Sequence, residues 1–170
     1  MRIWTVAASA ALVGALVVCG VTPAAAQGQS TDLSGGYQYV RDIDEGLNLT
    51  KGWVASLNRH LDPVVTLVAE VNGTYNNGGK QHVFQGGVRF GNSSNPDVTP
   101  FGQVLAGFSR LSGAGASANG FNLQPGGGID LRATDTAFLR LQGDYVMTRS
   151  SGVWSKSFRL AASVVFSLNQ

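Results

Sequence analysis

The stretch that decides the fold is Thr136–Leu168, which reads TAFLRLQGDYVMTRSSGVWSKSFRLAASVVFSL. Up to Thr148, apolar or small residues alternate with residues that include Arg and Asp, and the alternation resumes at Phe158 after the turn-like Arg149–Gly152. Successive side chains of a strand point to opposite faces. The pattern therefore predicts two strands, each with one nearly charge-free face and one face that carries charges.

Two architectures share this alternation, and they differ in which face is buried. In a soluble sandwich the apolar faces pack on a second sheet, whereas in an outer-membrane barrel they face lipid and the charged faces line a small lumen. The N-terminus decides between them, because a basic start at Met1–Arg2 precedes an apolar stretch over residues 3–21 and an A-x-A cleavage site at Ala24–Ala26. These features predict a secretory signal peptide over residues 1–26.

The composition of the exported part, residues 27–170, excludes several classes of protein. The single cysteine, Cys19, leaves with the signal peptide, so the exported chain cannot be held by a disulfide. Loss of Arg2 lowers the formal charge from +2 to +1, which gives no reason to expect nucleic acid as a partner. With 23 glycines and only 13% charged residues, the chain resembles neither a charge-rich disordered segment nor a helical bundle.

The same alternation recurs along residues 27–170 and predicts one all-β domain, an eight-stranded antiparallel up-and-down transmembrane β-barrel. An even strand number places both termini on the periplasmic side. Outer loops are expected at Asp42–Thr50, Asn76–Lys80, Leu111–Asn119 and Arg149–Val153. The eight expected strands are Leu33–Arg41, Lys51–Leu61, Val64–Tyr75, Gln81–Gly91, Thr99–Arg110, Gly120–Ala133, Thr136–Thr148 and Trp154–Leu168.

The strong charges within these strands are expected on one side of the sheet, the lumen side. An eight-stranded barrel has an interior just wide enough for side chains, so paired charges there predict a plug and no open pore. Aromatic residues near strand ends are expected to form girdles, and these are Tyr37, Tyr39, Trp53, Tyr75, Phe90, Phe101, Tyr145 and Trp154. The expected lumen polar network comprises Glu70, Arg89, Asp130, Arg132, Arg140, Asp144 and Arg159.

Several segments, taken in order, resemble the outer membrane beta-barrel domain family, small porin-like proteins related in architecture to the OmpA and OmpX barrels. They are LSGGY at Leu33–Tyr37, TPFG at Thr99–Gly102, GGGIDL at Gly126–Leu131, and LQGDY at Leu141–Tyr145 followed by SFRL at Ser157–Leu160. The resemblance covers the whole exported chain and implies an outer-membrane fold and location, since most members have no assigned activity. The chain ends in Asn169–Gln170, where such barrels usually end in an aromatic residue read by the assembly machinery.

Features of the sequence that could suggest a phosphate-binding loop or a metal site have simpler interpretations. Gly126–Gly128 lacks the Lys and helix of a phosphate-binding loop, so a bend or close strand approach is predicted there. His60 and His82 have no second ligand at metal-binding spacing. We therefore predict no catalytic residue, no metal site and no cofactor.

Together these patterns predict a non-enzymatic, monomeric protein of the Gram-negative outer membrane with a structural role. Its expected partners are outer-membrane lipid, lipopolysaccharide and, during assembly, the insertion machinery. Three alternatives stay open. One is adhesion or binding through the outer loops, tested at Trp154 and Lys156; the others are a narrow solute channel and a periplasmic lipocalin-like ligand-binding barrel with the two faces exchanged.

Overall fold

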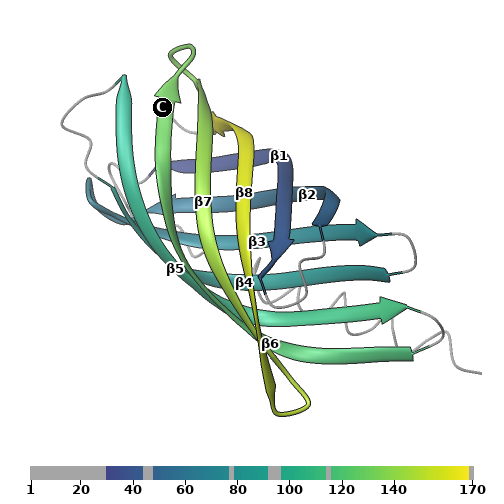
Figure 1. Ribbon diagram of the computed structural model, residues 1–170. Coiled ribbons are helices and arrows are strands. Elements are labelled where there is room, and N and C mark those ends of the chain that lie inside the picture. Colours follow the sequence, from purple (N-terminus) through teal and green to yellow (C-terminus); the bar gives the residue numbers. More distant parts are fainter. Residues whose placement is uncertain (1–29, 44–47, 77–78, 92–96, 114–115, 169–170) are drawn as a thin grey trace, which may run out of the picture.

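The computed structural model describes residues 30–43, 48–76, 79–91, 97–113 and 116–168. Residues 1–26, predicted to be the signal peptide, and Asn169–Gln170 lie outside the described residues. The described chain forms eight strands that close into one barrel (Figure 1). The strands are β1 Thr31–Asp42, β2 Asn48–His60, β3 Val65–Asn76, β4 Gly79–Gly91, β5 Val98–Gly113, β6 Ala116–Arg132, β7 Ala137–Ser150 and β8 Val153–Ser167.

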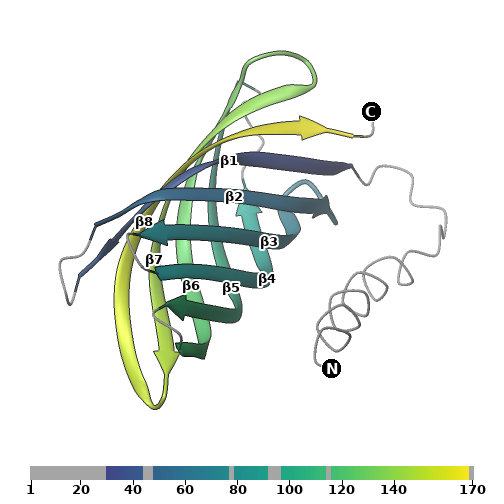
Figure 2. The ribbon, with the colours of Figure 1, turned by 90° about the vertical axis from the view of Figure 1, so that its right-hand side faces the viewer.

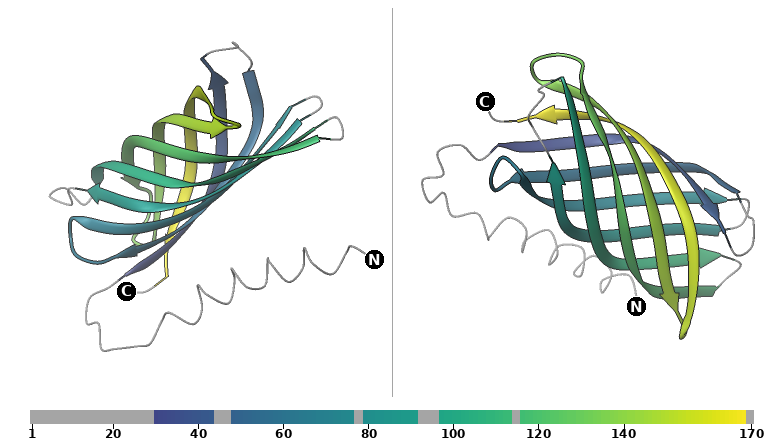
Figure 3. Two further views of the ribbon diagram at one scale, coloured as in Figure 1. Left: turned by 90° about the horizontal axis from the view of Figure 1, so that it is seen from below. Right: turned by 60° about the vertical axis from the view of Figure 1, so that its left-hand side comes forward.

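Every strand pairs antiparallel with its neighbour in the sequence, and β1 closes the ring by pairing with β8. The closing register runs from Asp32 opposite Ser167 to Asp42 opposite Ser157, so β1 and β8 are joined over this whole length and the ring is closed. Figures 2 and 3 show the strands running obliquely around the wall. This arrangement confirms the predicted fold class. We call the end where β1 begins and β8 ends the near end, and the opposite end the far end.

Short connections at both ends have local chemical causes. At the near end, the Asp62 carboxylate accepts hydrogen bonds from the backbone nitrogens of Val64 (2.7 Å) and Val65 (2.8 Å), which fixes the turn between β2 and β3. At the far end, Ser151 and Gly152 connect β7 to β8 with φ values of 51° and 86°. Positive φ at both central residues is what a two-residue hairpin turn of the type that matches strand twist requires.

The far-end connections are shorter than the sequence predicts. The segment Leu111–Asn119, expected to be a loop, is mostly strand, since β5 and β6 stay paired from Ser112 opposite Ser117 to Gly113 opposite Ala116. This segment is rich in Ser, Gly and Ala, which can form a strand but show no alternation of apolar and polar residues. The sequence pattern therefore did not indicate a strand there. On β8, Ser157 is the last ladder partner of β1, the Lys156 carbonyl still accepts a hydrogen bond from Ile43 N at 2.9 Å, and residues 153–155 pair only with β7. The β7–β8 hairpin therefore extends past the rim formed by β1.

The interior is polar and the exterior is apolar. Among the described residues, 19 buried residues are polar or charged, and only 8 are hydrophobic. Leu139, Leu160 and Phe166 lie outside with exposed fractions of 41%, 50% and 51%. The lipocalin-like alternative requires the two faces to be exchanged, with the apolar face inside. In this structure the apolar face is outside. The part of the chain that the structure describes holds no helix with the length and hydropathy to cross a membrane.

Candidate functional site in the barrel lumen

Arg159 crosses the lumen from β8. Its Nε donates to Asp144 Oδ2 at 2.8 Å on the adjacent strand β7. Its Nη1 donates to Glu70 Oε1 at 2.6 Å and its Nη2 to Glu70 Oε2 at 3.3 Å. Glu70 belongs to β3, which β1 and β2 separate from β8 around the wall. The contact therefore spans the interior, and all three side chains are at most 3% exposed.

Amide side chains satisfy the remaining acceptors of the two carboxylates. Glu70 Oε1 accepts from Gln85 Nε2 at 2.9 Å, and Asp144 accepts from Gln142 Nε2 at 2.8 Å and Gln103 Nε2 at 3.2 Å. Buried charges are tolerated when they are paired and fully hydrogen-bonded. We call this group the Arg159 network, comprising Arg159, Glu70, Asp144, Gln38, Asn72, Gln85, Gln103 and Gln142.

A second cluster of charges lies toward the near end. Arg140 and Asp130 face each other across β7 and β6, and two hydrogen bonds of 2.7 Å join the guanidinium to both carboxylate oxygens. Arg89 binds the Gln103 amide oxygen through Nε at 3.0 Å and Nη2 at 2.7 Å. Phe101 lies between these arginines, with its ring centroid 4.4 Å from Arg89 Cζ and 5.2 Å from Arg140 Cζ.

Phe101 corrects one sequence-based expectation. The sequence predicts it as a girdle residue, but it is 8% exposed and lies inside the lumen. The expected girdle residues Tyr37 and Trp53 do lie on the outer surface, where they are 55% and 39% exposed. Trp53 Nε1 donates to the hydroxyl of Tyr75 at 3.0 Å, as paired interfacial aromatics can. Inside the barrel, the Phe101 ring instead provides a cation–π surface for two arginines.

Glycines make room for the charged side chains. A Cβ built on Gly126 would overlap the Asp144 carboxyl group and the backbone of Gly143, and one on Gly128 would overlap the backbone of Leu141 and the Phe101 ring. The triple glycine of β6 is therefore a site of close strand approach, as the sequence predicts. Its function is to leave space for Asp144 and Phe101 inside a narrow barrel.

Beside Arg159, toward the far end, the lumen holds a cavity of about 30 Å³. Gln124 lines it, and Gln124 Nε2 has no hydrogen-bond partner among the described residues. A cavity of this size has room for a buried water, which also needs two or more polar neighbours. The other polar lining residues are Asn72, Thr74, Gln81, Asn122, Thr148 and Ser157.

The near-end rim carries its own polar contacts. His60 Nε2 lies 2.6 Å from Asp32 Oδ2, and His60 Nδ1 lies 3.0 Å from Thr66 Oγ1. These contacts join β1, β2 and β3, so their role is to hold the barrel end together. The described residues contain no cluster of three or more potential metal ligands around His60 or elsewhere.

Six of the seven residues expected in the lumen network form the two clusters, but Arg132 does not join them. Its side chain is 37% exposed at the near-end rim, within 3.9 Å of Asp97 and 3.5 Å of Asp135. Within the two clusters, three carboxylates balance three guanidiniums: Glu70, Asp130 and Asp144 against Arg89, Arg140 and Arg159.

The comparisons with known proteins concern the fold. No family model and no curated protein sequence matches this chain. Among solved structures, Neisserial surface protein A (NspA) superposes with a TM-score of 0.67 at 11% identity, covering 82% of this chain and 97% of that chain. The fold is that of the eight-stranded outer-membrane barrels.

Two further structures have the same architecture. Ail of Yersinia pestis, in complex with the heparin analogue sucrose octasulfate, matches with a TM-score of 0.53 at 17% identity over 82% of this chain and 100% of that chain. The N-terminal β-barrel domain of Pseudomonas aeruginosa OprF matches with a TM-score of 0.52 at 15% identity over the same shares. Likeness at these identities establishes the fold alone, so the role of this chain is argued from its own residues.

Proposed function

We propose that this protein is a non-enzymatic, structural barrel of the outer membrane whose lumen is closed by the Arg159 network. The single observation that carries the proposal is the contact of Arg159 with Glu70 across the interior. The apolar outer surface supports membrane insertion, because a soluble monomer rarely exposes such a surface. Export through a cleaved signal peptide, insertion by the assembly machinery and a monomeric state belong to the same proposal.

Charge balance and width both favour a closed lumen. Eight strands enclose little more than their own side chains, and the guanidinium of Arg159 bridges opposite walls with an exposed fraction of 1%. Because three carboxylates balance three guanidiniums in the two clusters, these clusters offer no net charge that would draw in ions of one sign. An ion would have to displace paired charges to pass.

Planar bilayer conductance tests the closed lumen. We expect the wild-type protein to give no steady conductance, and Arg159→Gln, which leaves Glu70 and Asp144 without their cation, to conduct. The matched control is Arg149→Gln, since Arg149 is exposed on the outer face. Folding of each variant is checked by heat-modifiable mobility on a denaturing gel. Steady wild-type conductance would overturn the closed lumen and favour the narrow-channel alternative.

Fractionation tests the location. A band in the detergent-extracted outer-membrane fraction that shifts between unboiled and boiled samples is expected for a folded membrane barrel. Recovery of the protein in the periplasmic extract without such a shift would contradict the proposed location.

A second candidate function, adhesion or binding at the far end, is favoured by the tip of the β7–β8 hairpin. Val153 and Trp154 are 71% and 45% exposed there, beyond the rim formed by β1. Trp154→Ala and Lys156→Gln should then reduce attachment of whole cells to a surface or host matrix, while the heat shift of the barrel stays unchanged. Unchanged attachment in both variants would remove this candidate.

A further inference from the structure

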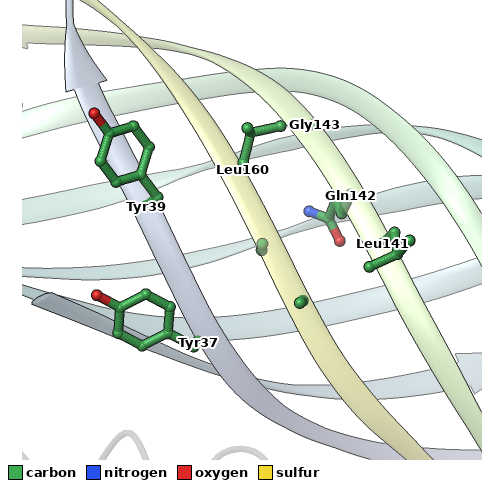
Figure 4. A pocket seen from close by; sticks show the side chains of 8 residues that line it. Tyr37, Tyr39, Leu141, Gln142, Gly143 and Leu160 are labelled. Carbon is green, nitrogen blue, oxygen red and sulfur yellow. The ribbon is translucent and has the colours of Figure 1, made fainter. Parts of the chain in front are cut away.

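A shallow groove of about 500 Å³ lies on the outer surface of the barrel where β7, β8 and β1 meet. Figure 4 shows Tyr37 and Tyr39 on β1, Leu160 on β8, and Leu141 and Gly143 on β7 around it. The wall is low here because Gly143 has no side chain and Ala162 has a small one. We call the outward surface of these three strands the β7–β8–β1 face.

The charges of the β7–β8–β1 face are all of one sign and lie at one end. Among the described residues of its three strands, the only outward-facing charged side chains are Arg41, Arg149 and Lys156, and each of them is exposed. All three lie between the groove and the far end. The acidic residues of these strands, Asp32, Asp42 and Asp144, have the inward parity.

The strand register places the cations directly beyond the groove. Tyr39 lies opposite Leu160, and the next outward pair toward the far end is Arg41 opposite Phe158. Two residues of a strand span about 7 Å, so the Arg41 backbone is about that far from the groove border at Tyr39. On β8, Lys156 is the next outward residue after Phe158 in the direction of the far end. On β7, Arg149 lies beside the hairpin tip, with its Cζ 5.8 Å from the Trp154 ring centroid.

We propose that the β7–β8–β1 face binds the lipid A part of lipopolysaccharide, with an acyl chain in the groove and a phosphate at Arg41 and Lys156. This inference rests on the proposed outer-membrane location, in which the far end faces the outer leaflet. An apolar groove with two or three cations beyond one end matches a lipid with several acyl chains and more than one phosphate. Spread over two adjacent strands and a hairpin tip, the cations can meet phosphates at separate positions.

A second copy of this chain fits the face less well. In a parallel membrane dimer the two-fold axis would place the same surface of both copies at the same height. Arg41 and Arg149 of each copy would then approach their counterparts, and the described outward side chains of these strands include no carboxylate. Phosphate is the complementary group, so the occupant is a lipid.

Two pairs of matched variants test the site. Arg41→Gln removes a cation from the face, and Arg110→Gln removes an outward arginine from β5 as its control. Gly143→Leu fills the groove, because a Cβ there meets only Leu160 and Phe158 side chains at 3.6 and 3.7 Å. Gly102→Leu is its control on β5, where the nearest atom to a Cβ is 3.9 Å away.

Binding is measured by native mass spectrometry of the refolded protein in detergent micelles titrated with purified bisphosphorylated lipid A, monophosphorylated lipid A or phosphatidylglycerol. We expect one bound bisphosphorylated lipid A, with affinity reduced about fivefold by Arg41→Gln, the effect of roughly 1 kcal/mol per basic residue near a membrane surface. Gly143→Leu should also weaken binding, and both controls should bind like the wild type.

Three outcomes would overturn the site. Equal binding by all variants would place lipid A elsewhere, and equal binding of phosphatidylglycerol would show general anion attraction only. Stronger binding of monophosphorylated lipid A would contradict a role for the phosphates. A protein that shows no heat shift in micelles would instead overturn the proposed membrane barrel, so the two failures are distinguishable.

Discussion

Arg140 and Asp130 face each other directly across β7 and β6, and two hydrogen bonds of 2.7 Å join them. Arg140 is 3% exposed, so its charge depends on this partner. Arg140→Gln leaves a carboxylate without its cation and is expected to lower the free energy of unfolding by roughly 3 kcal/mol, the lower end for a broken buried pair, because the Asp130 side chain is 16% exposed. Urea unfolding in micelles measures this loss.

The double variant Arg140→Gln/Asp130→Asn separates charge from packing. It replaces both charged partners with neutral amides, which leaves no carboxylate without its cation, so we expect it to recover much of the lost stability. A double variant that is no more stable than Arg140→Gln alone would show that the pair acts through packing and not through charge.

Phe101 supports two arginines from inside the barrel, so its truncation should be costly. Phe101→Ala removes a buried ring and both cation–π contacts, and we expect a loss of about 3–5 kcal/mol in unfolding free energy. Phe108→Ala is the matched control, because Phe108 is on the same strand but faces outward with 72% exposure. Equal losses in the two variants would contradict the lumen position of Phe101.

Gly126 leaves space for the Asp144 carboxyl group, and a methyl group there would occupy that space. Gly126→Ala is therefore expected to destabilise the barrel by about 1–3 kcal/mol, the usual cost of overpacking. Gly86→Ala serves as the comparison, since the nearest atom to a Cβ on Gly86 is 3.5 Å away. We expect Gly126→Ala to have the lower unfolding midpoint of the two variants. A lower midpoint for Gly86→Ala would refute the close approach at β6.

Gly152 turns the β7–β8 hairpin with a φ of 86°. A side chain at this φ costs about 1–2 kcal/mol, so Gly152→Ala should lower the stability of the hairpin by about that amount. Ser151→Asn, at a φ of 51°, should cause no loss because Asn tolerates this conformation. Hydrogen exchange of the amides in residues 147–156 reports both effects, and equal exchange in the two variants would argue against turn strain.

Much of the fold follows from alternation alone, because a strand has only two faces and the charges of the two lumen clusters all lie on the inner one. The expectation that every strand charge lies on that side is wrong for Arg41, Arg149 and Lys156, which lie on the outer face near the far end. The ends of β5 and β6 could not be predicted in this way. The last residues of β5 and the first residues of β6 are Ser, Gly and Ala, which carry no apolar pattern, although their backbones stay paired.

The inner face of the site could also be predicted, whereas its contacts could not. Parity places Arg159 and Glu70 inside, but their pairing depends on which strand lies across the closed ring. Parity also contained a missed signal: Phe101 shares its face with Gln103, so it points inward despite its position near a strand end. The long amides Gln38, Gln85 and Gln103 likewise share the parity of the charges they bind.

Arg159 lies on β8 and its guanidinium contacts Glu70 on β3, so this contact requires β8 and β3 to face each other across the closed ring. A slip of one residue between β7 and β8 would turn this arginine outward, where no carboxylate of these strands could receive it. A slip of two residues would place Ser157 or Ala161 opposite Asp144 and leave its charge uncompensated. Arg159 therefore favours the correct register of the closed ring, because an incorrect register leaves buried charges without their partners.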